Sequence, residues 1–557
     1  MLANVVRRRE ATTEAAVEAG VVASTDGWLA LMGQLEYGRR WQDRALDLSL
    51  KFDPELDDDS GNGSIRTFAA DGGLLGESRL RTRATKRQDE ASASWRQPWA
   101  GGRLTLTAAA RGERTHTGTS IDAILGDAGD QQVRETEDSR EAEFGARFVR
   151  QLGGHSTMEM VLSQQLGWLD GKERSLEGAE SESFDEKTDT GETIGHLELT
   201  HEHSRQLSLA ASLEGAFNFL ESDAALVVDG VPVLLPGSRV RIEEKRVEAS
   251  FGASWKPNDH WLLEAAMRVE RSSISQSGDS PLQRRFTYPK PRLSARWDLD
   301  ESNQFRFVVS REVGQLEFGD FVASASLESG LVTAGNASLE PDKTWRSSAA
   351  WERQLWTDAS LILTWTHDRI SDVIDRVLVV TPEDAFDAPG NIGEGKRDTL
   401  AMELSAPLDR FGFSGAHLRG SMAWRRSRVT DPVTGQSRNI SEEKPVEASI
   451  ELTQDLPALR LDWGLALEHI AERETKYRFD EVTRESEAMG WTLFAERRIG
   501  ARWRVRGEAT DLFGRDFIET RDRYEGPRST SVLEETERRR RRTPGYFSLT
   551  FRRSMGG

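Results

Sequence analysis

Apolar and polar residues alternate one by one along many stretches of this chain, and this pattern constrains the fold more than any other feature. Successive side chains of a β-strand point to opposite faces, so strict alternation predicts a strand with one apolar and one polar face. The polar face is often charged, as at Glu447 and Glu451. The clearest runs are residues 46–52, 104–110, 247–255, 446–452 and 459–467. The pattern extends along the whole chain and predicts an all-β protein.

Short and long connections also alternate along the chain. Short ones include residues 99–102, 153–155 and 500–502. Long, polar and often acidic connections are expected at residues 54–76, 117–139, 170–192 and 313–341. Counting runs and connections gives about 22 strands, within the range of outer-membrane barrels, which have brief periplasmic turns and extended extracellular loops. The expected fold is a closed antiparallel transmembrane β-barrel of about 22 strands with this asymmetry.

Composition agrees with a barrel whose lumen is polar. Charged residues make up 30% of the 557 residues, and the mean hydropathy is -0.58. No stretch approaches the roughly 18 to 20 consecutive apolar residues of a membrane helix. The net charge of -19 argues against a nucleic-acid partner, and the lack of cysteine excludes disulfides and Cys-based zinc or redox sites. Residues 1–10 contain no apolar core of a secretory signal.

One loop carries the most specific signal in the sequence. Residues 335–344 read GNASLEPDKT and lie between two alternating stretches. Gly335 and Asn336 suit the left-handed backbone of a tight turn, and Pro341 biases Glu340 toward extended structure. This segment is expected to end a long loop and to enter a strand that descends toward the short turns.

The same loop resembles the G-N-x-x-L-x-P-E-x-[ST] loop of TonB-dependent outer-membrane receptors, with Asp342 where Glu is usual. Residues 289–320, residues 509–517 (ATDLFGRDF) and residues 545–551 (GYFSLTF) are similar to other parts of the barrel of that family. These segments lie in the C-terminal half, whereas the N-terminal half matches only in its strand pattern. The resemblance implies a receptor barrel in the outer membrane of a Gram-negative bacterium.

The resemblance also implies an energised importer rather than an enzyme. Such receptors bind a scarce nutrient, such as a siderophore–metal chelate, a vitamin or an oligosaccharide, at extracellular loops, and TonB pulls on a plug domain inside the barrel. Residues 3–9 look like the last plug strand. We therefore expect residues 1–10 to be a remnant of the plug domain and residues 11–557 to be the transmembrane barrel domain.

The resemblance implies several partners. They are TonB (through a plug domain missing from this chain), an unknown small-molecule ligand, outer-membrane lipid and lipopolysaccharide, and the barrel-assembly machinery. That machinery reads a terminal aromatic residue, whereas here Phe551 is followed by six further residues. Neither nucleic acid nor a cofactor is expected.

Three other stretches contain residue types that bind ions. The five arginines at 538–542 could contact lipopolysaccharide phosphates or an anionic ligand, but a solvated strand start balancing nearby glutamates is favoured. Residues 57–63 (DDDSGNG) lack the spaced ligands of an EF-hand and predict a flexible acidic loop. His201 and His203 share a strand face beside a short turn, without further metal ligands nearby in the sequence, and are expected at the periplasmic rim.

No catalytic motif stands out in the sequence. G-x-S-x-G, Walker A and H-E-x-x-H are not found, so no catalytic, cofactor-binding or metal-binding residue is predicted, and the substrate-binding residues are left unassigned. Two other interpretations stay open. A complete, plugless barrel could act as a passive pore or a surface-binding protein, and a soluble β-rich protein would also contain many strands.

Overall fold

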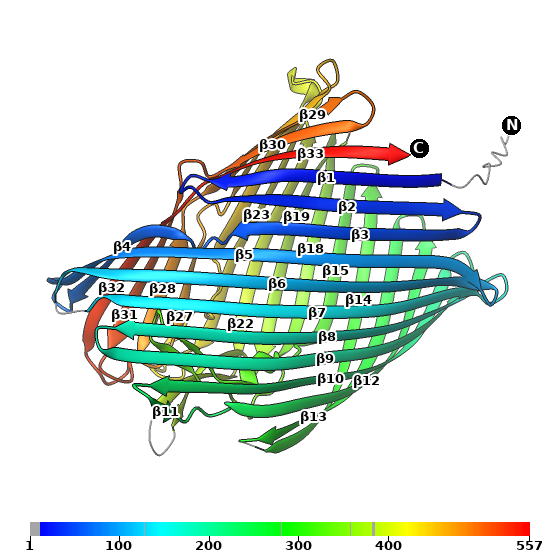
Figure 1. Ribbon diagram of the computed structural model, residues 1–557. Coiled ribbons are helices and arrows are strands. Elements are labelled where there is room, and N and C mark those ends of the chain that lie inside the picture. The colour runs from blue at the N-terminus through cyan, green and yellow to red at the C-terminus, as the bar shows by residue number, and fades with distance from the viewer. Residues whose placement is uncertain (1–11, 127–128, 280, 357, 381–384, 557) are drawn as a thin grey trace.

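The computed structural model describes residues 12–126, 129–279, 281–356, 358–380 and 385–556. Within these residues, 22 antiparallel strands form one closed barrel, as the alternating pattern predicts (Figure 1). The strands of the wall are β1 (Thr12–Ser24), β2 (Leu29–Trp41), β3 (Arg44–Leu56), β5 (Leu74–Trp99), β6 (Gly102–Leu125), β7 (Gln131–Gln151), β8 (Ser156–Glu177), β9 (Glu180–Glu202), β10 (Leu207–Val228), β12 (Arg239–Asn258), β13 (Trp261–Gly278), β14 (Leu282–Asp300), β15 (Asn303–Val313), β18 (Lys343–Trp356), β19 (Ala359–Ser371), β22 (Gly395–Pro407), β23 (Ala416–Thr430), β25 (Val446–Leu456), β26 (Leu461–Glu468), β29 (Gly490–Ile499), β30 (Trp503–Thr510) and β33 (Tyr546–Gly556).

The first and last strands close the barrel. β33 pairs with β1, from Glu14 opposite Gly556 to Ser24 opposite Tyr546, and its other edge pairs with β30. Each described wall strand therefore has hydrogen-bonded neighbours on both sides. This closure removes the unpaired strand edges that a bilayer does not tolerate.

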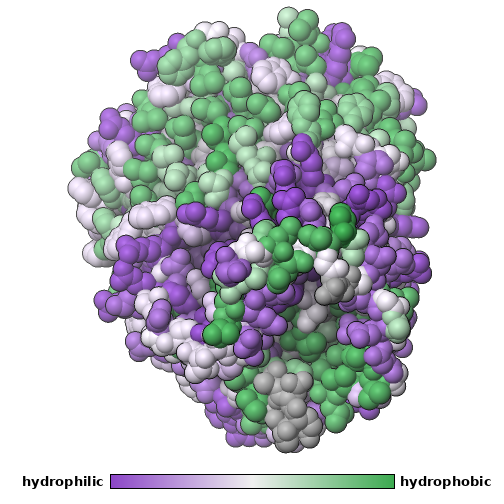
Figure 2. Space-filling view, turned by 90° about the vertical axis from the view of Figure 1, so that its left-hand side faces the viewer, coloured by the Kyte–Doolittle hydropathy of each residue, from purple (hydrophilic) through white to green (hydrophobic). Residues whose placement is uncertain are grey.

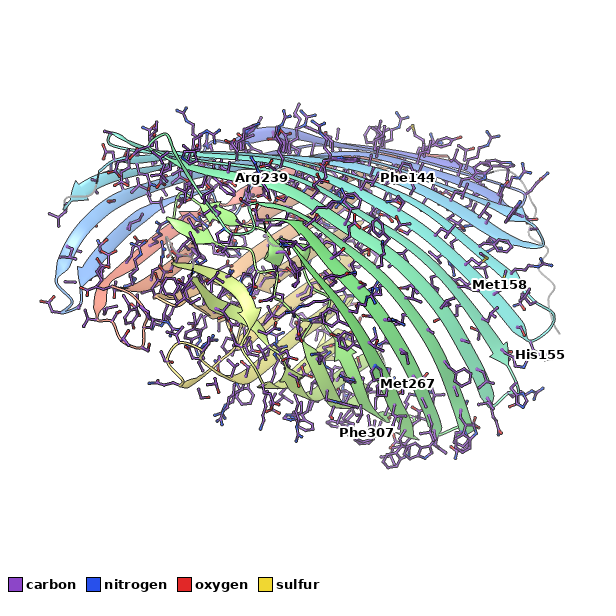
Figure 3. All side chains as sticks on the ribbon, turned by 90° about the horizontal axis from the view of Figure 1, so that it is seen from below. Phe144, His155, Met158, Arg239, Met267 and Phe307 are labelled. Carbon is purple, nitrogen blue, oxygen red and sulfur yellow. The ribbon has the colours of Figure 1, made fainter. Side chains whose placement is uncertain are left out.

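Large apolar side chains cover the outside of the wall. Phe144, Met267 and Phe307 are all about half exposed, and Figure 3 shows them on different parts of the barrel. The alternate residues of each strand face the lumen, where Lys290 donates a hydrogen bond to Glu270 at 2.8 Å. This arrangement confirms the predicted apolar and charged faces and follows from the two-residue repeat of a strand.

The two ends of the barrel differ, as predicted. At one end, which we call the short-turn end, connections are brief, such as residues 100–101 between β5 and β6. At the long-loop end, the connections include residues 314–342 between β15 and β18 and residues 511–545 between β30 and β33. Figure 2 looks onto the long-loop end, where hydrophilic residues gather across the middle of the face around a smaller hydrophobic group.

The prediction of long loops is wrong at two of the four places. Residues 117–139 and 170–192 consist mostly of strand, because β6, β7, β8 and β9 all continue beyond the apolar zone. Only two residues, Gly178 and Ala179, connect β8 to β9. Backbone pairing does not need an apolar face, so the ladder continues where both faces are polar and the alternating pattern disappears.

At the long-loop end, five strands from three connections pair edge to edge and continue the sheet outward from β5. They are β4 (Gly61–Ala69), β32 (Leu533–Thr543), β31 (Arg515–Tyr524), β28 (Glu481–Glu487) and β27 (Arg473–Tyr477). They pair in the order β5, β4, β32, β31, β28, β27, and we call these five strands the rim sheet. Opposite ends of the chain become neighbours here, since Arg538 of β32 lies opposite Arg66 of β4.

A smaller sheet lies in the mouth of the barrel at the same end. It consists of β16 (Ser324–Ser326), β17 (Leu331–Thr333), β20 (Ile374–Val380) and β21 (Ala385–Asn391), and we call it the mouth sheet. It packs against side chains that face inward from the wall. Phe184 of β9 and Leu226 of β10 form one core cluster with Ala323, Ala334 and Phe386.

The remaining described elements are short. They are β11 (Val231–Val233), β24 (Ser437–Arg438) and two 3-10 helices, η1 (Phe318–Phe321) and η2 (Asp409–Phe411). Among the residues that the structure describes, no helix has the length and apolar character needed to cross a membrane.

Candidate functional site at the mouth of the barrel

Residues 314–342, which we call the strap, run along the inside of the barrel mouth from their attachment at β15 and β18. The base of the strap is apolar. Phe321 and Leu339 are 2% and 1% exposed and pack in one core cluster with Ile242 of β12, which is fully buried. Full burial of such side chains contributes roughly 1.5–3 kcal/mol each. The base is therefore an integral part of the folded wall.

The loop with the strongest sequence signal, residues 335–344, ends the strap and leads into β18, as predicted. Its backbone differs from the expected left-handed turn, because neither Gly335 nor Asn336 has a positive φ. Gly335 serves close packing instead, since a Cβ there would lie 2.1 Å from the carbonyl oxygen of Phe321. The side chain of Asn336 donates a hydrogen bond to the carbonyl of Pro389 at 2.8 Å, which ties the strap to β21.

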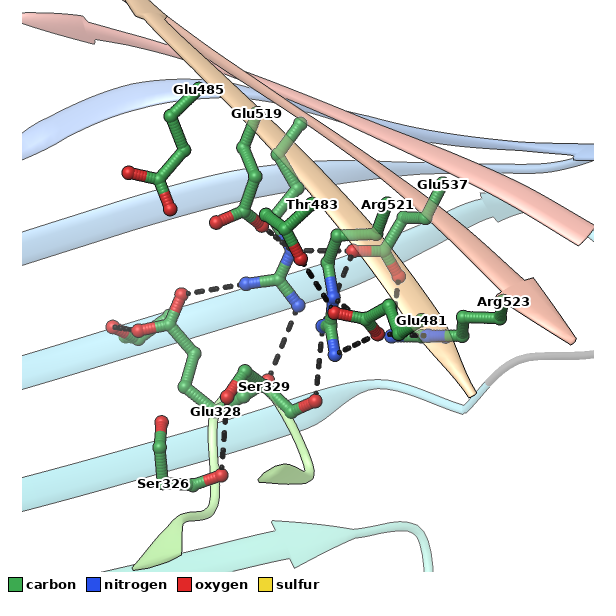
Figure 4. A network of polar contacts seen from close by, with 12 residues as sticks. Ser326, Glu328, Ser329, Glu481, Thr483, Glu485, Glu519, Arg521, Arg523 and Glu537 are labelled. Atoms are coloured by element: carbon green, nitrogen blue, oxygen red, sulfur yellow. Dashed lines mark hydrogen bonds and ion pairs between the residues drawn. The ribbon is translucent and has the colours of Figure 1, made fainter. Parts of the chain in front are cut away.

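The tip of the strap makes polar contacts with the rim sheet (Figure 4). Glu328 pairs with Arg539 of β32 at 3.0 Å. The carbonyl oxygen of Ser329 accepts a hydrogen bond from Arg521 of β31, also at 3.0 Å. We call these two contacts the latch.

The wall of the barrel holds the same tip. Glu173 of β8 accepts hydrogen bonds from the backbone N–H groups of Leu327 and Glu328, at 3.0 and 3.3 Å. Gln131 of β7 donates to the carbonyl of Leu327 at 3.1 Å, and the hydroxyl of Thr119 of β6 donates to the Glu328 carboxylate at 3.4 Å. Three wall strands and two rim strands therefore converge on a single turn of the strap.

The arginines of the latch are also paired within the rim sheet. Arg521 is 2% exposed and pairs with Glu481 at 2.8 Å, and Arg539 pairs with Glu537 at 2.6 Å. Burial raises the pKa of Glu537, but the guanidinium groups of Arg539 and Arg523 outweigh that effect and hold the pKa below its usual range. Such pairing makes buried charges tolerable.

The five consecutive arginines form the second half of β32. Because strand residues alternate between faces, the first, third and fifth are exposed, whereas Arg539 and Arg541 are mostly buried on the inner face. Arg541 pairs with Asp59 at 2.6 Å. The prediction of a solvated strand start therefore holds only for the three outward-facing arginines. The two inward-facing arginines form ion pairs with other segments of the chain.

The predicted acidic loop, residues 57–63, lies beside this strand. Asp58 pairs with Arg515 of β31 at 2.8 Å, and Asp59 pairs with Arg541. Its carboxylates thus face cations from the connection between β30 and β33. This is an arrangement of ion pairs, and it differs from the convergent oxygen ligands of a calcium loop.

A second buried network joins four connections at the long-loop end. Asp431 accepts hydrogen bonds from Arg438 at 2.7 Å and from Arg528 at 2.8 Å, and Arg438 also pairs with Asp375 at 2.8 Å. The guanidinium of Arg438 lies 4.4 Å from the ring centroid of Tyr477. Burial raises the pKa of Asp431, but hydrogen bonds from Arg528, the backbone and Arg438 lower it to about 2.

His201 and His203 form one pair of histidines, and His469 belongs to a separate group of potential metal ligands. His201 and the histidine two residues later lie at the short-turn end, as expected, with ring centroids 6.2 Å apart. At the long-loop end, His469, Glu472 and Glu487 have ligand atoms within 4.8 Å of one another. Glu472 also accepts a hydrogen bond from Lys444 at 2.6 Å, so this carboxylate is already used in an ion pair.

Sequence reasoning did not single out Glu328, Arg521 or Asp431. The partners of these residues are remote in the chain, since 211 positions separate Glu328 from Arg539 and 97 separate Asp431 from Arg528. The arginine run of β32 and the acidic residues 57–63 were the two local signals that pointed to this region.

Comparison with known proteins agrees with this architecture. The family described as TonB dependent receptor-like, beta-barrel, matches residues 162–552, well over half of the chain. A comparison with curated proteins finds no match.

Several solved structures have the same fold. A siderophore receptor from Acinetobacter baumannii aligns with a TM-score of 0.65 and 10% identity over 97% of this chain and 82% of that one. The ferric yersiniabactin uptake receptor from Yersinia pestis aligns with a TM-score of 0.62 and 12% identity, over 99% of this chain and 81% of the receptor. The ferric-catecholate import receptor of E. coli K12 aligns with a TM-score of 0.63 and 10% identity, over 98% of this chain and 82% of the receptor. Identities this low show the fold alone, whereas the family match shows kinship: this chain belongs to the TonB-dependent receptors, β-barrel proteins of the Gram-negative outer membrane.

Proposed function

We propose that this barrel belongs to a receptor that imports one scarce solute across the outer membrane with energy delivered by TonB. Members of the family are receptors and transporters rather than enzymes. The observation that carries the proposal is the construction of the mouth. Its connections fold inward and interlock through the strap, the mouth sheet and the Asp431 network. A mouth of this kind suits selective capture better than the free passage of a passive pore.

A siderophore–metal chelate is the ligand class to test first, ahead of vitamins and oligosaccharides. The structural neighbours include receptors named for siderophores and a copper transporter, and this guides the order of testing. Beneath the base of the strap lies a cavity of about 370 Å³, lined in part by Glu192, Asn218, Glu244, Gln315 and Phe318. Its volume lies in the usual range of small-molecule sites, and we place the first solute contacts there.

Coupling to TonB would run through a plug domain. The proposed end of that domain, residues 1–10, lies outside the described residues, and the barrel domain is proposed to comprise residues 11–557. Lipopolysaccharide around the wall and the barrel-assembly machinery acting on β33 are further proposed partners.

Radioactive iron uptake tests this proposal. The native gene product is expressed in a Gram-negative host that lacks its own iron-chelate receptors, and a panel of ferric siderophores is supplied with and without TonB. We expect uptake of one chelate, lost when TonB is deleted or when the inner-membrane proton gradient is collapsed. Uptake of many unrelated small solutes without TonB would instead establish the passive pore.

A further inference from the structure

We propose that His469, Glu472 and Glu487 form a binding site for one divalent transition-metal ion, best suited to Zn²⁺, at the base of the hairpin of β27 and β28. The three residues lie in the connection between β26 and β29, at the long-loop end of the barrel. Their side chains offer one imidazole nitrogen and two carboxylate oxygens, a donor set that Zn²⁺ accepts. The site does not depend on the proposed import of a solute.

The spacing of the three ligand atoms fits a tetrahedral metal site. Nδ1 of His469 lies 3.3 Å from Oε2 of Glu472 and 3.3 Å from Oε2 of Glu487. In a tetrahedral Zn²⁺ site with bonds of about 2.0–2.1 Å, neighbouring ligand atoms are separated by roughly 3.3 Å. One metal ion can therefore contact all three atoms after small shifts of the side chains, and a water molecule can take the fourth position.

The two glutamates lie opposite each other at the end of a strand ladder. Arg473 of β27 pairs with Ser486 of β28, so the next step of the ladder places Glu472 beside Glu487. The backbone N–H of Glu487 donates to the carbonyl of Glu472 at 3.4 Å. Like charges directly opposite on neighbouring strands are destabilising. A divalent cation bound by both carboxylates would replace this repulsion with attraction.

The backbone fixes the histidine relative to the first glutamate. His469 and Ala471 have φ values of +54° and +59°, a conformation that few residues other than glycine adopt. This tight turn brings together the side chains of His469 and Glu472, which are three positions apart. The N–H of Ile470 donates to the carbonyl of Ala448 in β25 at 3.4 Å, which anchors the turn to the wall. Local backbone structure therefore holds these two ligands in place.

A negatively lined cavity adjoins the site. It has a volume of about 410 Å³ and is lined in part by Glu403, Arg425, Glu447, Glu468, His469 and Glu472. Four glutamates against one arginine give this lining a negative charge, which raises the local concentration of cations. The side chains of His469 and Glu487 are about one-third exposed, so an ion can reach them from solvent.

Lys444 is the cation that a metal ion would displace. Its Nζ lies 2.6 Å from Oε2 of Glu472, but its side chain is 40% exposed and can turn into water. Its release therefore costs only the net free energy of one hydrogen bond between charged groups. Arg515 lies farther away, 3.7 Å from Glu487, and is held by Asp58 at 2.8 Å, so it can stay in place. The two carboxylates thus have either the lysine or the metal ion as their nearest cation.

Calorimetric titration of Zn²⁺ into the folded 557-residue chain in detergent tests the site, with visible absorption of bound Co²⁺ as a second readout. We expect one ion per chain and the intense bands of tetrahedral Co²⁺. His469→Ala should weaken Zn²⁺ binding at least about tenfold, since loss of a residue that merely orients a metal ligand already costs about 10–100-fold. Ca²⁺ should not compete, because it takes oxygen ligands rather than imidazole.

Lys444→Met separates loss of the site from loss of the fold. Removal of the competing ammonium should raise the Zn²⁺ affinity about tenfold, a gain that misfolding would not produce. The control is the double variant His201→Ala with His203→Ala, which removes the histidine pair at the short-turn end and should leave binding unchanged. Heat-modifiable gel mobility confirms that each variant is folded. Absence of Zn²⁺ binding to the unchanged chain, or undiminished binding by His469→Ala, would overturn the site.

Discussion

At the residue scale, the close approach of two backbone segments and the pairing of buried charges decide how the mouth is built. Gly335 is required because the backbone of Phe321 occupies the place of a side chain, and Asp431 is required because two buried arginines need a counter-charge. Neither requirement is visible in the neighbouring sequence. Both depend on a segment that the fold brings in from elsewhere.

Replacing Gly335 by alanine should loosen the strap. The added Cβ would meet the carbonyl oxygen of Phe321 at 2.1 Å, and overpacking of this kind costs about 1–3 kcal/mol. We expect faster proteolysis of the strap and a lower melting temperature. Gly319→Ala is the control in the same segment, because a Cβ at Gly319 meets no atom within 4 Å. Equal behaviour of the two variants would contradict the packing argument.

The Asp431 network should weaken in acid. The pKa of Asp431 is about 2 in the folded protein, against 3.8 without the fold, so its ionised form is stabilised by about 2 kcal/mol. That stability is complete above pH 4 and is lost as the pH falls toward 2. Hydrogen exchange of the extracellular loops between pH 5 and 2 should show this loss. Asp431→Asn should show weakened loops at every pH and no such transition.

At the element scale, β32 shows how one strand serves two environments. Its run of arginines would repel itself in a loop, but strand geometry sends alternate side chains to opposite faces. The outer arginines meet solvent, and the inner ones meet Glu537, Glu519 and Asp59. A sequence that looks uniformly solvated thus builds a buried ion-pair network.

Neighbouring arginines of β32 should therefore differ sharply in their tolerance to substitution. Arg539→Gln removes the closest cation of the buried Glu537, which keeps Arg523 at 3.3 Å, and loss of a hydrogen bond to a charged group costs roughly 1.5–3 kcal/mol. Arg538→Gln changes an exposed side chain and should alter stability by less than about 0.5 kcal/mol. Denaturant unfolding of both variants in detergent measures the difference. Similar losses for both would show that the alternation does not determine their roles.

At the scale of the whole molecule, stability depends on closure. β33 completes a ladder with β1 on one side and with β30 on the other, and ion pairs from Arg552 to Glu18 and Glu36 reinforce the seam inside the lumen. In lipid, an open seam would leave two rows of unpaired backbone groups, each costing several kcal/mol. The barrel is thus a single cooperative unit rather than a chain of independent hairpins.

Deletion of residues 546–557 should abolish folding of the whole barrel. The deletion removes β33 and exposes the edges of both β1 and β30. We expect the heat-modifiable band on gels to disappear and the protein to become fully protease-sensitive. Arg552→Ala, which removes only the ion pairs of the seam, should still fold. A folded barrel after the deletion would show that closure is not essential.

The sequence by itself determined the barrel, its strand number and the family. These features rest on local chemistry, namely the two-residue alternation in strands such as β12 and β25 and the motif at residues 335–344. The sequence also indicated which end carries the long connections. It overestimated the loops at residues 117–139 and 170–192, because strands that are polar on both faces have no alternating pattern.

Only the tertiary structure decided how the loops at the mouth pair with one another. The latch between Glu328 and Arg539, the pairing of β4 with β32 and the placement of Gly335 against Phe321 all join segments whose local sequences do not specify one another. Charged side chains can pair with many partners, and the closed wall selects the pairs by bringing particular loops together. Alternation is a property of neighbouring residues, whereas the latch is a property of the closed barrel.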